Sequence, residues 1–346
     1  MALNEISSIP IVDLSPFTSG GDHESRRRAA KDLAEKVQIN GSVGICGHGV
    51  PSETLREAFT LAKKLFDLPY EEKMKAPHPD AVFPHRGYSS IGREKVAAKT
   101  AMETETDSEL GKEVYLNASD YKESYEIGSE DNSAQYNIWL PEEILPGFRN
   151  DTLKLYWMLN NTANAILDAL IMSLGLTESE AENIRNLHNG HENQLRFLHY
   201  PPISSEMLGN TNIGRLGAHT DWGLFTLLFQ DTSGGLEFGD CRTGGFMPAT
   251  PKDGIVYMNI GDMFQRISNG LYPSALHRVV ISGKASGEPT PSRYSIPYFV
   301  VPLPDGVVEP QPSLVAAHEK QLYEPVVYRS YSEQMFAVTQ VRDTKE

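Results

Sequence analysis

Three residues in the second half of the chain have the types and spacing of a metal site. His219 and Asp221 are separated by one residue, and His277 follows further downstream. Side chains at i and i+2 of a strand point the same way, so both groups can reach one ion from a strand end. Two imidazoles and one carboxylate form the facial ligand set of non-haem Fe(II) oxygenases, which leaves positions for a chelating co-substrate and O2. We therefore predict an Fe(II) site at these three residues.

A second pair of residues predicts a carboxylate clamp. Arg293 and Ser295 are again at i and i+2, so a guanidinium and a hydroxyl share one face of a strand. The planar guanidinium suits bidentate binding of a carboxylate, as at the remote end of an anchored 2-oxo acid. A zinc hydrolase could use the same three metal ligands but would have no use for this clamp.

The elements that must position these residues change in type along the chain. Apolar spacing of i, i+3 and i+4 predicts helices over 24–39, 54–68, 145–174 and 330–338. After Gln194, short β segments with Gly and Pro turns follow at 194–200, 224–230, 235–238, 246–249, 255–260, 277–282 and 293–301. We predict an α+β fold whose β core is a sandwich or jelly roll.

One domain accounts for the whole chain, 1–346, because no stretch has the composition of a linker. We expect 1–175 to form a mainly helical N-terminal cap, 176–310 the jelly-roll core, and 311–346 a C-terminal helix and tail. Residues 76–141 lack periodicity and are predicted to form a long loop, of the kind that often serves as a lid. A short strand over 42–51 ends in a glycine-rich turn, where His48 is expected to be structural.

The bulk properties exclude several classes of partner. The formal net charge of −15 disfavours binding to nucleic acid or to an anionic membrane surface. The first residues lack the basic and apolar pattern expected of a signal peptide, and no apolar run in the sequence has the length of a membrane span. Two cysteines are too few for a disulfide framework. We expect a cytoplasmic protein that binds a small-molecule substrate, and its oligomeric state does not follow from the sequence.

Eight segments, spread over nearly the whole chain, resemble the isopenicillin N synthase-like Fe(II)/2-oxoglutarate dioxygenases. The similar segments are 9–14, 47–51, 195–202, 217–223, 227–231, 259–263, 274–279 and 293–295. The resemblance implies a double-stranded β-helix, or jelly roll, with flanking helices. It also implies that His219, Asp221 and His277 bind Fe(II). The 2-oxoglutarate C5 carboxylate would then be held by Arg293 and Ser295, assisted by Tyr200.

Two further segments, 86–96 and 122–128, are similar to the fungal thymine-7-hydroxylase branch. That similarity implies that Asn193 and Arg196 contact the substrate and that Phe299 stacks on it. Tyr88, in the first segment, is a further pocket candidate. Trp222 departs from the branch, which has tyrosine there, so thymine does not follow as the substrate. Arg196 could instead form an internal salt bridge, and Trp222 and Phe299 could be plain core.

These observations predict a 2-oxoglutarate-dependent dioxygenase that oxidises an organic small molecule, by hydroxylation, desaturation or rearrangement. Succinate and CO2 would be released, and natural-product biosynthesis is the expected setting. Three alternatives remain open: a pyrimidine hydroxylase of nucleobase salvage, a 2-oxoglutarate-independent oxidase of the isopenicillin N synthase type, and a metal-free jelly-roll binding protein.

Overall fold

Two facing β-sheets form the centre of the computed structural model, which describes residues 8–81, 83–93, 119–208, 213–281 and 289–339. The main sheet has eight strands, in the spatial order β1 (Ile11–Asp13), β2 (Ser42–Cys46), β12 (Val256–Ile260), β9 (Phe225–Gln230), β14 (Arg293–Val300), β6 (Gln194–Tyr200), β5 (Glu123–Ile127) and β3 (Gly87–Ser89). The smaller sheet has the order β11 (Gly245–Pro248), β10 (Leu236–Asp240), β13 (His277–Val279) and β8 (Leu216–His219). Two short pairs complete the strands: β15 (Val307–Val308) with β16 (Val326–Val327), and β4 (Ser119–Asp120) with β7 (Ile213–Gly214).

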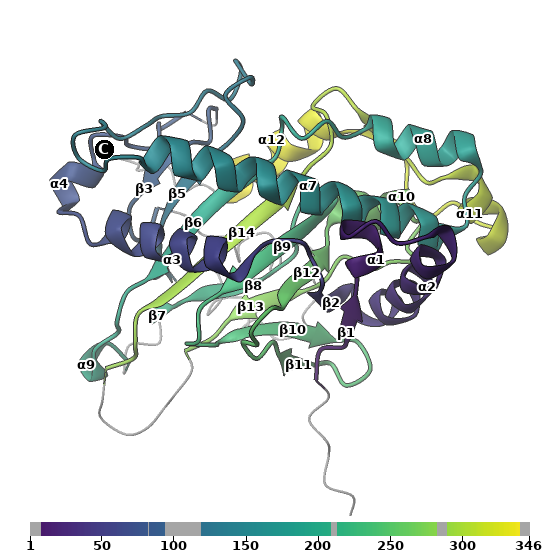
Figure 1. The fold of residues 1–346 in the computed structure, drawn as a ribbon, viewed down its shortest axis with the longest axis horizontal. Helices are drawn as coiled ribbons and strands as arrows, with labels where there is room; N and C mark the ends of the chain where they lie inside the picture. Colours follow the sequence, from purple (N-terminus) through teal and green to yellow (C-terminus); the bar gives the residue numbers. More distant parts are fainter. Residues whose placement is uncertain (1–7, 82, 94–118, 209–212, 282–288, 340–346) are drawn as a thin grey trace, which may run out of the picture.

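Helices cover the outer face of the main sheet. The long α7 (Phe148–Leu174) runs across this face, with α3 (Ser52–Phe66) and α2 (His23–Asn40) beside it (Figure 1). α2 starts where the Asp22 carboxylate accepts the Ser25 N–H at 2.7 Å, and it ends at Gly41 in the left-handed conformation. The remaining helices are α1 (Ser15–Thr18), α4 (Tyr70–Lys73), α8 (Glu178–Asn186), α9 (Ser205–Leu208), α10 (Asp262–Ile267), α11 (Pro312–His318) and α12 (Tyr328–Thr339).

Two apolar cores hold these layers together. The larger one lies between the helices and the main sheet and includes Leu33, Leu159 and Phe225, all fully buried. The smaller one lies between the two sheets and includes Tyr200 and Phe238. Because side chains alternate across a strand, the main sheet contributes to both cores, and its inner face is free to line a site between the sheets.

The jelly-roll architecture and the principal helices and strands agree with the sequence-based expectations. The predicted strand over 194–200 corresponds to β6, and the predicted helix over 145–174 corresponds to α7. The predicted strand over 277–282 ends at Val279, and Ser282 lies outside the described residues. The short strand β8, which carries the first metal-ligand candidate, was not predicted, because four residues give too little pattern to recognise.

The predicted loop over 76–141 is wrong, because β3 and β5 lie within it and complete one edge of the main sheet. All five residues of β5 are buried, including Glu123 and Glu126. These carboxylates pair with buried cations, so the strand lacks the apolar alternation by which strands are recognised. The proposed core boundary at 176 is wrong for the same sheet, since β1, β2, β3 and β5 precede it. Residues 94–118, including the last part of the 86–96 segment, lie outside the described chain.

Candidate active site

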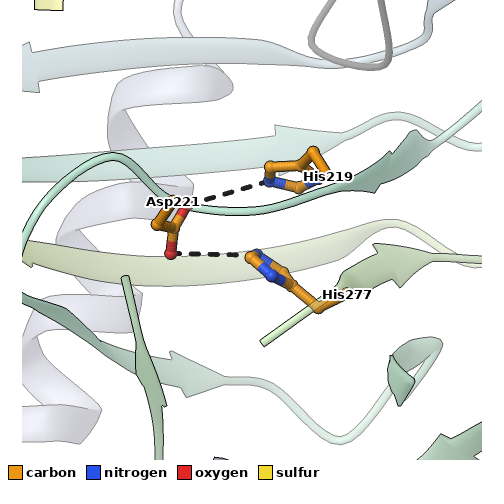
Figure 2. Close-up of side chains that lie close together, drawn as sticks. All are labelled: His219, Asp221 and His277. Atoms are coloured by element: carbon orange, nitrogen blue, oxygen red, sulfur yellow. Dashed lines mark ion pairs between the residues drawn. The ribbon is translucent and has the colours of Figure 1, made fainter. Parts of the chain in front are cut away.

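Two opposed strands of the smaller sheet bring the two candidate histidine ligands together. His219 ends β8 and His277 begins β13, and the antiparallel register places them directly opposite each other, with ring centroids 4.2 Å apart. Asp221 follows two residues after His219, in the turn that leads to β9. Its Oδ1 lies 3.9 Å from His219 Nε2, and its Oδ2 lies 3.9 Å from His277 Nε2. Figure 2 shows both imidazoles pointing toward this carboxylate. One atom from each residue lies within 4.8 Å of the other two.

Backbone carbonyls fix the tautomers of both histidines. Nδ1 of His219 donates to Gly217 O at 2.8 Å, and Nδ1 of His277 donates to Ala275 O at 3.0 Å. Because a carbonyl can only accept, the proton stays on Nδ1 and the Nε2 lone pair faces the site. Burial and the neighbouring His277 lower the pKa of His219 to about 3, so its ring is neutral, as a metal ligand must be.

Two polar side chains hold the carboxylate of Asp221. Thr226 Oγ1 donates to Oδ2 at 2.6 Å, and Asn259 Nδ2 donates to the same oxygen at 2.8 Å. Burial alone would raise the pKa of Asp221, but the two imidazoles and these two hydrogen bonds outweigh it and lower the pKa. Two imidazole Nε2 atoms and one carboxylate on the same side of the cavity are a ligand set that fits Fe(II).

The predicted carboxylate clamp is assembled on β14. Arg293 Nη1 donates to Ser295 Oγ at 3.1 Å, while Nε donates to Gly234 O at 2.7 Å and Nη2 to Gln230 Oε1 at 3.2 Å. Tyr200 lies opposite Arg293 in the register of β6 and β14, with its ring centroid 4.9 Å from the guanidinium carbon. The structure thus brings Arg293, Ser295 and Tyr200 together.

A cavity of about 1060 Å³ lies between the two sheets and contains the three metal-ligand candidates. Its apolar floor comes from both sheets, through Leu198, Leu228, Leu216, Leu236 and Val279. Tyr200 lines the cavity, whereas Arg293 and Ser295 are almost fully buried and are not among its lining residues. A volume of this size is typical of sites that enclose a small organic molecule.

The C-terminal helix α12 forms one wall of the cavity. Tyr328, Arg329, Ser332 and Phe336 line it from this helix. The Phe336 ring packs edge to face against Trp222, with centroids 4.8 Å apart, and also contacts Phe83 and His85. Trp222 is therefore part of the cavity wall beside the metal-ligand candidates.

Another part of the cavity wall is polar and is joined to α12 through His85, which contacts Phe336. Arg196 lies over the Phe299 ring at 5.6 Å, and both residues line the cavity. Behind it, Glu126 forms an ion pair with Arg196 at 3.0 Å, and His85 Nε2 accepts from Arg196 Nη2 at 2.7 Å. Arg196 therefore forms the internal salt bridge that was one of its two expected roles, and because it also lines the cavity, a contact with the substrate stays a prediction.

Two predicted pocket residues do not reach the cavity. Asn193 is fully buried, and its amide contacts Asn160, Tyr298, His188 and the Val301 N–H. Tyr88 is buried on the other face of the sheet, where its hydroxyl donates to Glu123 at 2.5 Å. Neither residue lines the cavity, which corrects their assignment to the substrate pocket.

Comparisons with known proteins agree with this geometry. A family model described as the non-haem dioxygenase in morphine synthesis N-terminal region matches residues 9–143, and the 2OG-Fe(II) oxygenase superfamily model matches 191–302. A 2-oxoglutarate-dependent dioxygenase of Dothideomycetidae sp. is 34% identical over 89% of this chain and 90% of its own length. The chain belongs to the 2OG-Fe(II) oxygenase superfamily.

Two other relatives of this oxygenase are named for different substrates. A proline hydroxylase of Petromyces alliaceus is 36% identical over 82% of this chain and 84% of its own. The solved structure of full-length Neurospora crassa thymine-7-hydroxylase in complex with α-KG and thymine is 32% identical, with a TM-score of 0.82 over 97% of this chain and 98% of the other. The oxygenase uses Fe(II), 2-oxoglutarate and O2, and it is an Fe(II)/2-oxoglutarate-dependent dioxygenase.

Sequence reasoning missed several residues of this oxygenase site. Asn259 and Thr226 hold the carboxylate of the metal-ligand candidate Asp221, and a single asparagine inside the apolar strand β12 could have signalled such a role. Arg215 is buried beside Tyr200 and donates to Tyr200 O at 3.1 Å and Pro291 O at 2.8 Å. Phe336 could not have been placed, because only the folded chain brings α12 to the cavity.

Proposed function

We propose that this dioxygenase oxidises a C–H bond of an organic small molecule in natural-product biosynthesis. One observation carries the proposal: the three metal-ligand candidates open into a cavity of about 1060 Å³ that has an apolar floor, aromatic walls and a polar side. The expected overall reaction is R–H + 2-oxoglutarate + O2 → R–OH + succinate + CO2. One oxygen atom enters the alcohol and the other enters succinate.

In this proposal, His219, Asp221 and His277 hold Fe(II), and Arg293, Ser295 and Tyr200 hold the remote carboxylate of 2-oxoglutarate. Bound Fe(II) supplies the redox chemistry that activates O2. The chain supplies geometry: backbone carbonyls orient the imidazoles, and Thr226 and Asn259 orient the carboxylate. Trp222, Phe299 and Phe336 exclude water and set the position of the substrate C–H bond.

An anaerobic titration tests the cofactor assignment. Addition of 2-oxoglutarate to the Fe(II)-loaded protein should produce a visible metal-to-ligand charge-transfer band. His219→Ala should abolish the band, whereas a matched substitution at the exposed His318 should leave it unchanged. A wild-type protein without the band would contradict the proposal. Succinate formation in a screen of pyrimidines, amino acids and polycyclic metabolites then identifies the substrate.

The three alternative functions are supported to different degrees. A pyrimidine substrate is favoured by the similarity to the thymine-bound Neurospora crassa structure, yet the amide of Asn193 is occupied by protein groups. A 2-oxoglutarate-independent oxidase of the isopenicillin N synthase type would share this fold, but it is disfavoured by the similarity over most of the chain to relatives named 2-oxoglutarate-dependent dioxygenases. A metal-free binding protein is disfavoured by the three buried metal-ligand candidates that line the cavity. Desaturation and rearrangement differ from hydroxylation only in the fate of the oxidised carbon, and product analysis distinguishes them.

No helix within the described part of the chain combines the length and apolarity needed to cross a bilayer. We infer from the composition that the protein acts in the cytoplasm, where its thiols stay reduced. Fractionation of the native organism's cells, followed by immunodetection, tests this location.

A further inference from the structure

One buried cation in the cavity wall has no acidic partner. Arg86 immediately precedes β3, is 2% exposed and lines the cavity. Its Nη1 donates to His85 O at 2.8 Å, but its Nε has no hydrogen-bond partner. Within the described residues, no carboxylate forms an ion pair with this guanidinium. Buried charges are normally paired, so this arrangement calls for an explanation.

Nearby carboxylates attract Arg86 but have other partners. Glu126 pairs with Arg196 at 3.0 Å and accepts from Ser124 at 2.6 Å. Glu192 lines the same cavity and accepts from Asn132 Nδ2 at 2.8 Å. Both acids help to keep Arg86 charged, and neither occupies the hydrogen-bonding edge of its guanidinium.

The fold makes room for this guanidinium. It packs directly on the backbone of Gly128, where an added Cβ would overlap the Nη2 atom of Arg86. Burial lowers the pKa of Arg86 to about 10, so the side chain remains protonated near neutral pH. A buried cation held without a direct partner reduces stability, and such a cost is typical of a binding residue.

A second unsatisfied donor lies beside Arg86. Gln194 begins β6, lines the cavity, and its buried Nε2 has no hydrogen-bond partner. The pairing of Ile127 with Leu195 places Gly128, and hence the guanidinium packed on it, beside Gln194. Two adjacent donors without acceptors match a ligand group that has paired acceptor oxygens.

Most of the other acidic groups that line the cavity have partners of their own, and Glu192 accepts from the Asn132 amide. Asp305 pairs with Arg329 at 3.1 Å, and Asp131 lies 3.6 Å from His191. Asp221 belongs to the set of metal-ligand candidates. A carboxylate is the organic anion that suits a single planar guanidinium and an amide N–H.

We propose that Arg86 and Gln194 form a subsite that binds a carboxylate of the substrate, so that this oxygenase acts on organic acids. The inference rests on the proposed function, because it concerns the substrate of the same cavity. The subsite is separate from the Arg293 clamp, which holds the co-substrate. It leaves the aromatic residues at α12 to contact the body of the acid.

Matched pairs of probes test the subsite. The probes are the ω-phenylalkanoates from phenylacetate to 6-phenylhexanoate and their primary amides, which share a shape but differ in charge. Each is titrated calorimetrically into the anaerobic protein loaded with Fe(II) and saturated with 2-oxoglutarate, so that the clamp is occupied. We expect at least one acid to bind about 10-fold or more tightly than its amide. If no acid exceeds its amide, the proposal is overturned.

Substitutions assign this preference to the two residues. Arg86→Met should reduce the acid-to-amide preference below about twofold, leave amide affinity unchanged, and leave the Tm unchanged or raised. Arg329→Met removes another cavity cation, one already paired with Asp305, and should retain the preference. An unchanged preference in Arg86→Met, with a lowered Tm, would make Arg86 a structural residue and overturn the proposal.

Gln194→Leu provides a second test that does not depend on the folding of the Arg86 variant. The preference should fall by about threefold or more, and an unchanged preference would contradict the subsite. The charge-transfer band distinguishes a failure of the 2-oxoglutarate assignment from a failure of the carboxylate subsite. Its absence in the wild type would contradict the 2-oxoglutarate chemistry, whereas its presence without any acid preference would contradict the carboxylate subsite alone.

Discussion

At the scale of single residues, the metal-ligand candidates depend on groups that a motif does not contain. The spacing of His219 and Asp221 is local and could be read from the sequence. Their orientation comes from backbone carbonyls and from Thr226 and Asn259, which the turn into β9 and the neighbouring β12 bring to the carboxylate. Local spacing thus predicted the metal-ligand candidates, whereas the hydrogen bonds from Thr226 and Asn259 to Asp221 depend on the pairing of strands in the folded chain.

The hydroxyl of Thr226 should affect metal affinity without touching the metal. Thr226→Val removes the 2.6 Å hydrogen bond to Asp221 and should weaken Fe(II) binding about 10–100-fold. Thr226→Ser keeps the hydroxyl and should bind Fe(II) within about twofold of the wild type. Anaerobic Fe(II) titration measures both variants, and equal affinities for valine and serine would exclude a role for this hydrogen bond.

The assignment of Asn193 and Tyr88 to the substrate pocket was wrong because of the direction of their side chains. Both residues lie in or beside segments that resemble relatives, so their types could be carried over from the motif. The direction of a side chain depends on which face of the sheet becomes the cavity. Asn193 joins the core contacts of α7 and β14, and Tyr88 points to Glu123 on the helix side of the sheet.

At the scale of elements, the pairing of β6 with β14 places buried side chains behind the proposed co-substrate clamp. His199 is opposite Tyr294, stacks on its ring at 4.6 Å, and contacts Ser292 Oγ at 3.1 Å. Ser292 and Tyr294 flank Arg293 in sequence. His199 is itself held by Glu123 at 2.7 Å, so a buried network fixes both neighbours of the clamp arginine.

His199 should therefore act as a positioning residue for 2-oxoglutarate. His199→Ala removes the contacts on both sides of Arg293 and should raise the KM for 2-oxoglutarate by about tenfold, with a smaller effect on kcat. His199→Gln can restore a hydrogen bond to Ser292 and should recover part of the affinity. Steady-state kinetics with varied 2-oxoglutarate tests this, and equal losses in KM and kcat for both variants would argue against positioning.

The glycine-rich turn between β2 and α3 contains a titratable group. Burial lowers the pKa of His48, and its Nδ1 accepts the Val50 N–H at 3.2 Å. The folded state therefore takes up this proton less readily than the unfolded chain, whose pKa is about 6.5. This contribution to stability is present above about pH 6.5 and is lost as the pH falls below it.

His48→Asn keeps an acceptor in the turn but cannot take up this proton. Between about pH 7 and pH 5 its free energy of unfolding should fall less steeply than that of the wild type, by at most about 1.4 kcal/mol per pH unit. Urea denaturation of the apoprotein at several pH values measures the slope. His318→Asn at the exposed end of α11 is the control, and identical slopes for wild type and His48→Asn would refute the assignment.

The helix α12 should determine how well the cavity excludes water. Phe336→Ala removes the ring that packs on Trp222, Phe83 and His85. We expect the charge-transfer band to persist while 2-oxoglutarate consumption becomes uncoupled from product formation, by about tenfold, because the substrate C–H bond is less well positioned. Phe336→Leu should be intermediate. Tight coupling in the alanine variant would show that the helix has no such role.

At the scale of the whole molecule, the fold class could be predicted from local patterns, but the division of the chain could not. The apolar periodicity of α2, α3 and α7 and the patterns of the strands β6, β9, β10, β11, β12, β13 and β14 were local signals. The strands β3 and β5 were missed because their buried residues include Ser89, Glu123 and Glu126, whose polar partners lie far away in sequence. Long-range pairing of this kind has no local pattern.

The mixed origin of the main sheet predicts cooperative unfolding. Strands β1 and β2 form one edge and β5 and β3 the other, so both edges come from the first half of the chain while the centre comes from the second. We expect a single calorimetric transition, with equal calorimetric and van't Hoff enthalpies, for 1–346 as one domain. Two separate transitions would instead assign the helical cap and the jelly roll to independent units.

The wall that α12 contributes to the cavity also has a consequence for biosynthesis. During translation, α12 leaves the ribosome after His277, Arg293 and the rest of both sheets. The candidate metal and co-substrate residues thus leave the ribosome before the helix that completes this wall of the cavity. If the sheets fold as they emerge, we expect the candidate iron site to be accessible from this side until α12 docks.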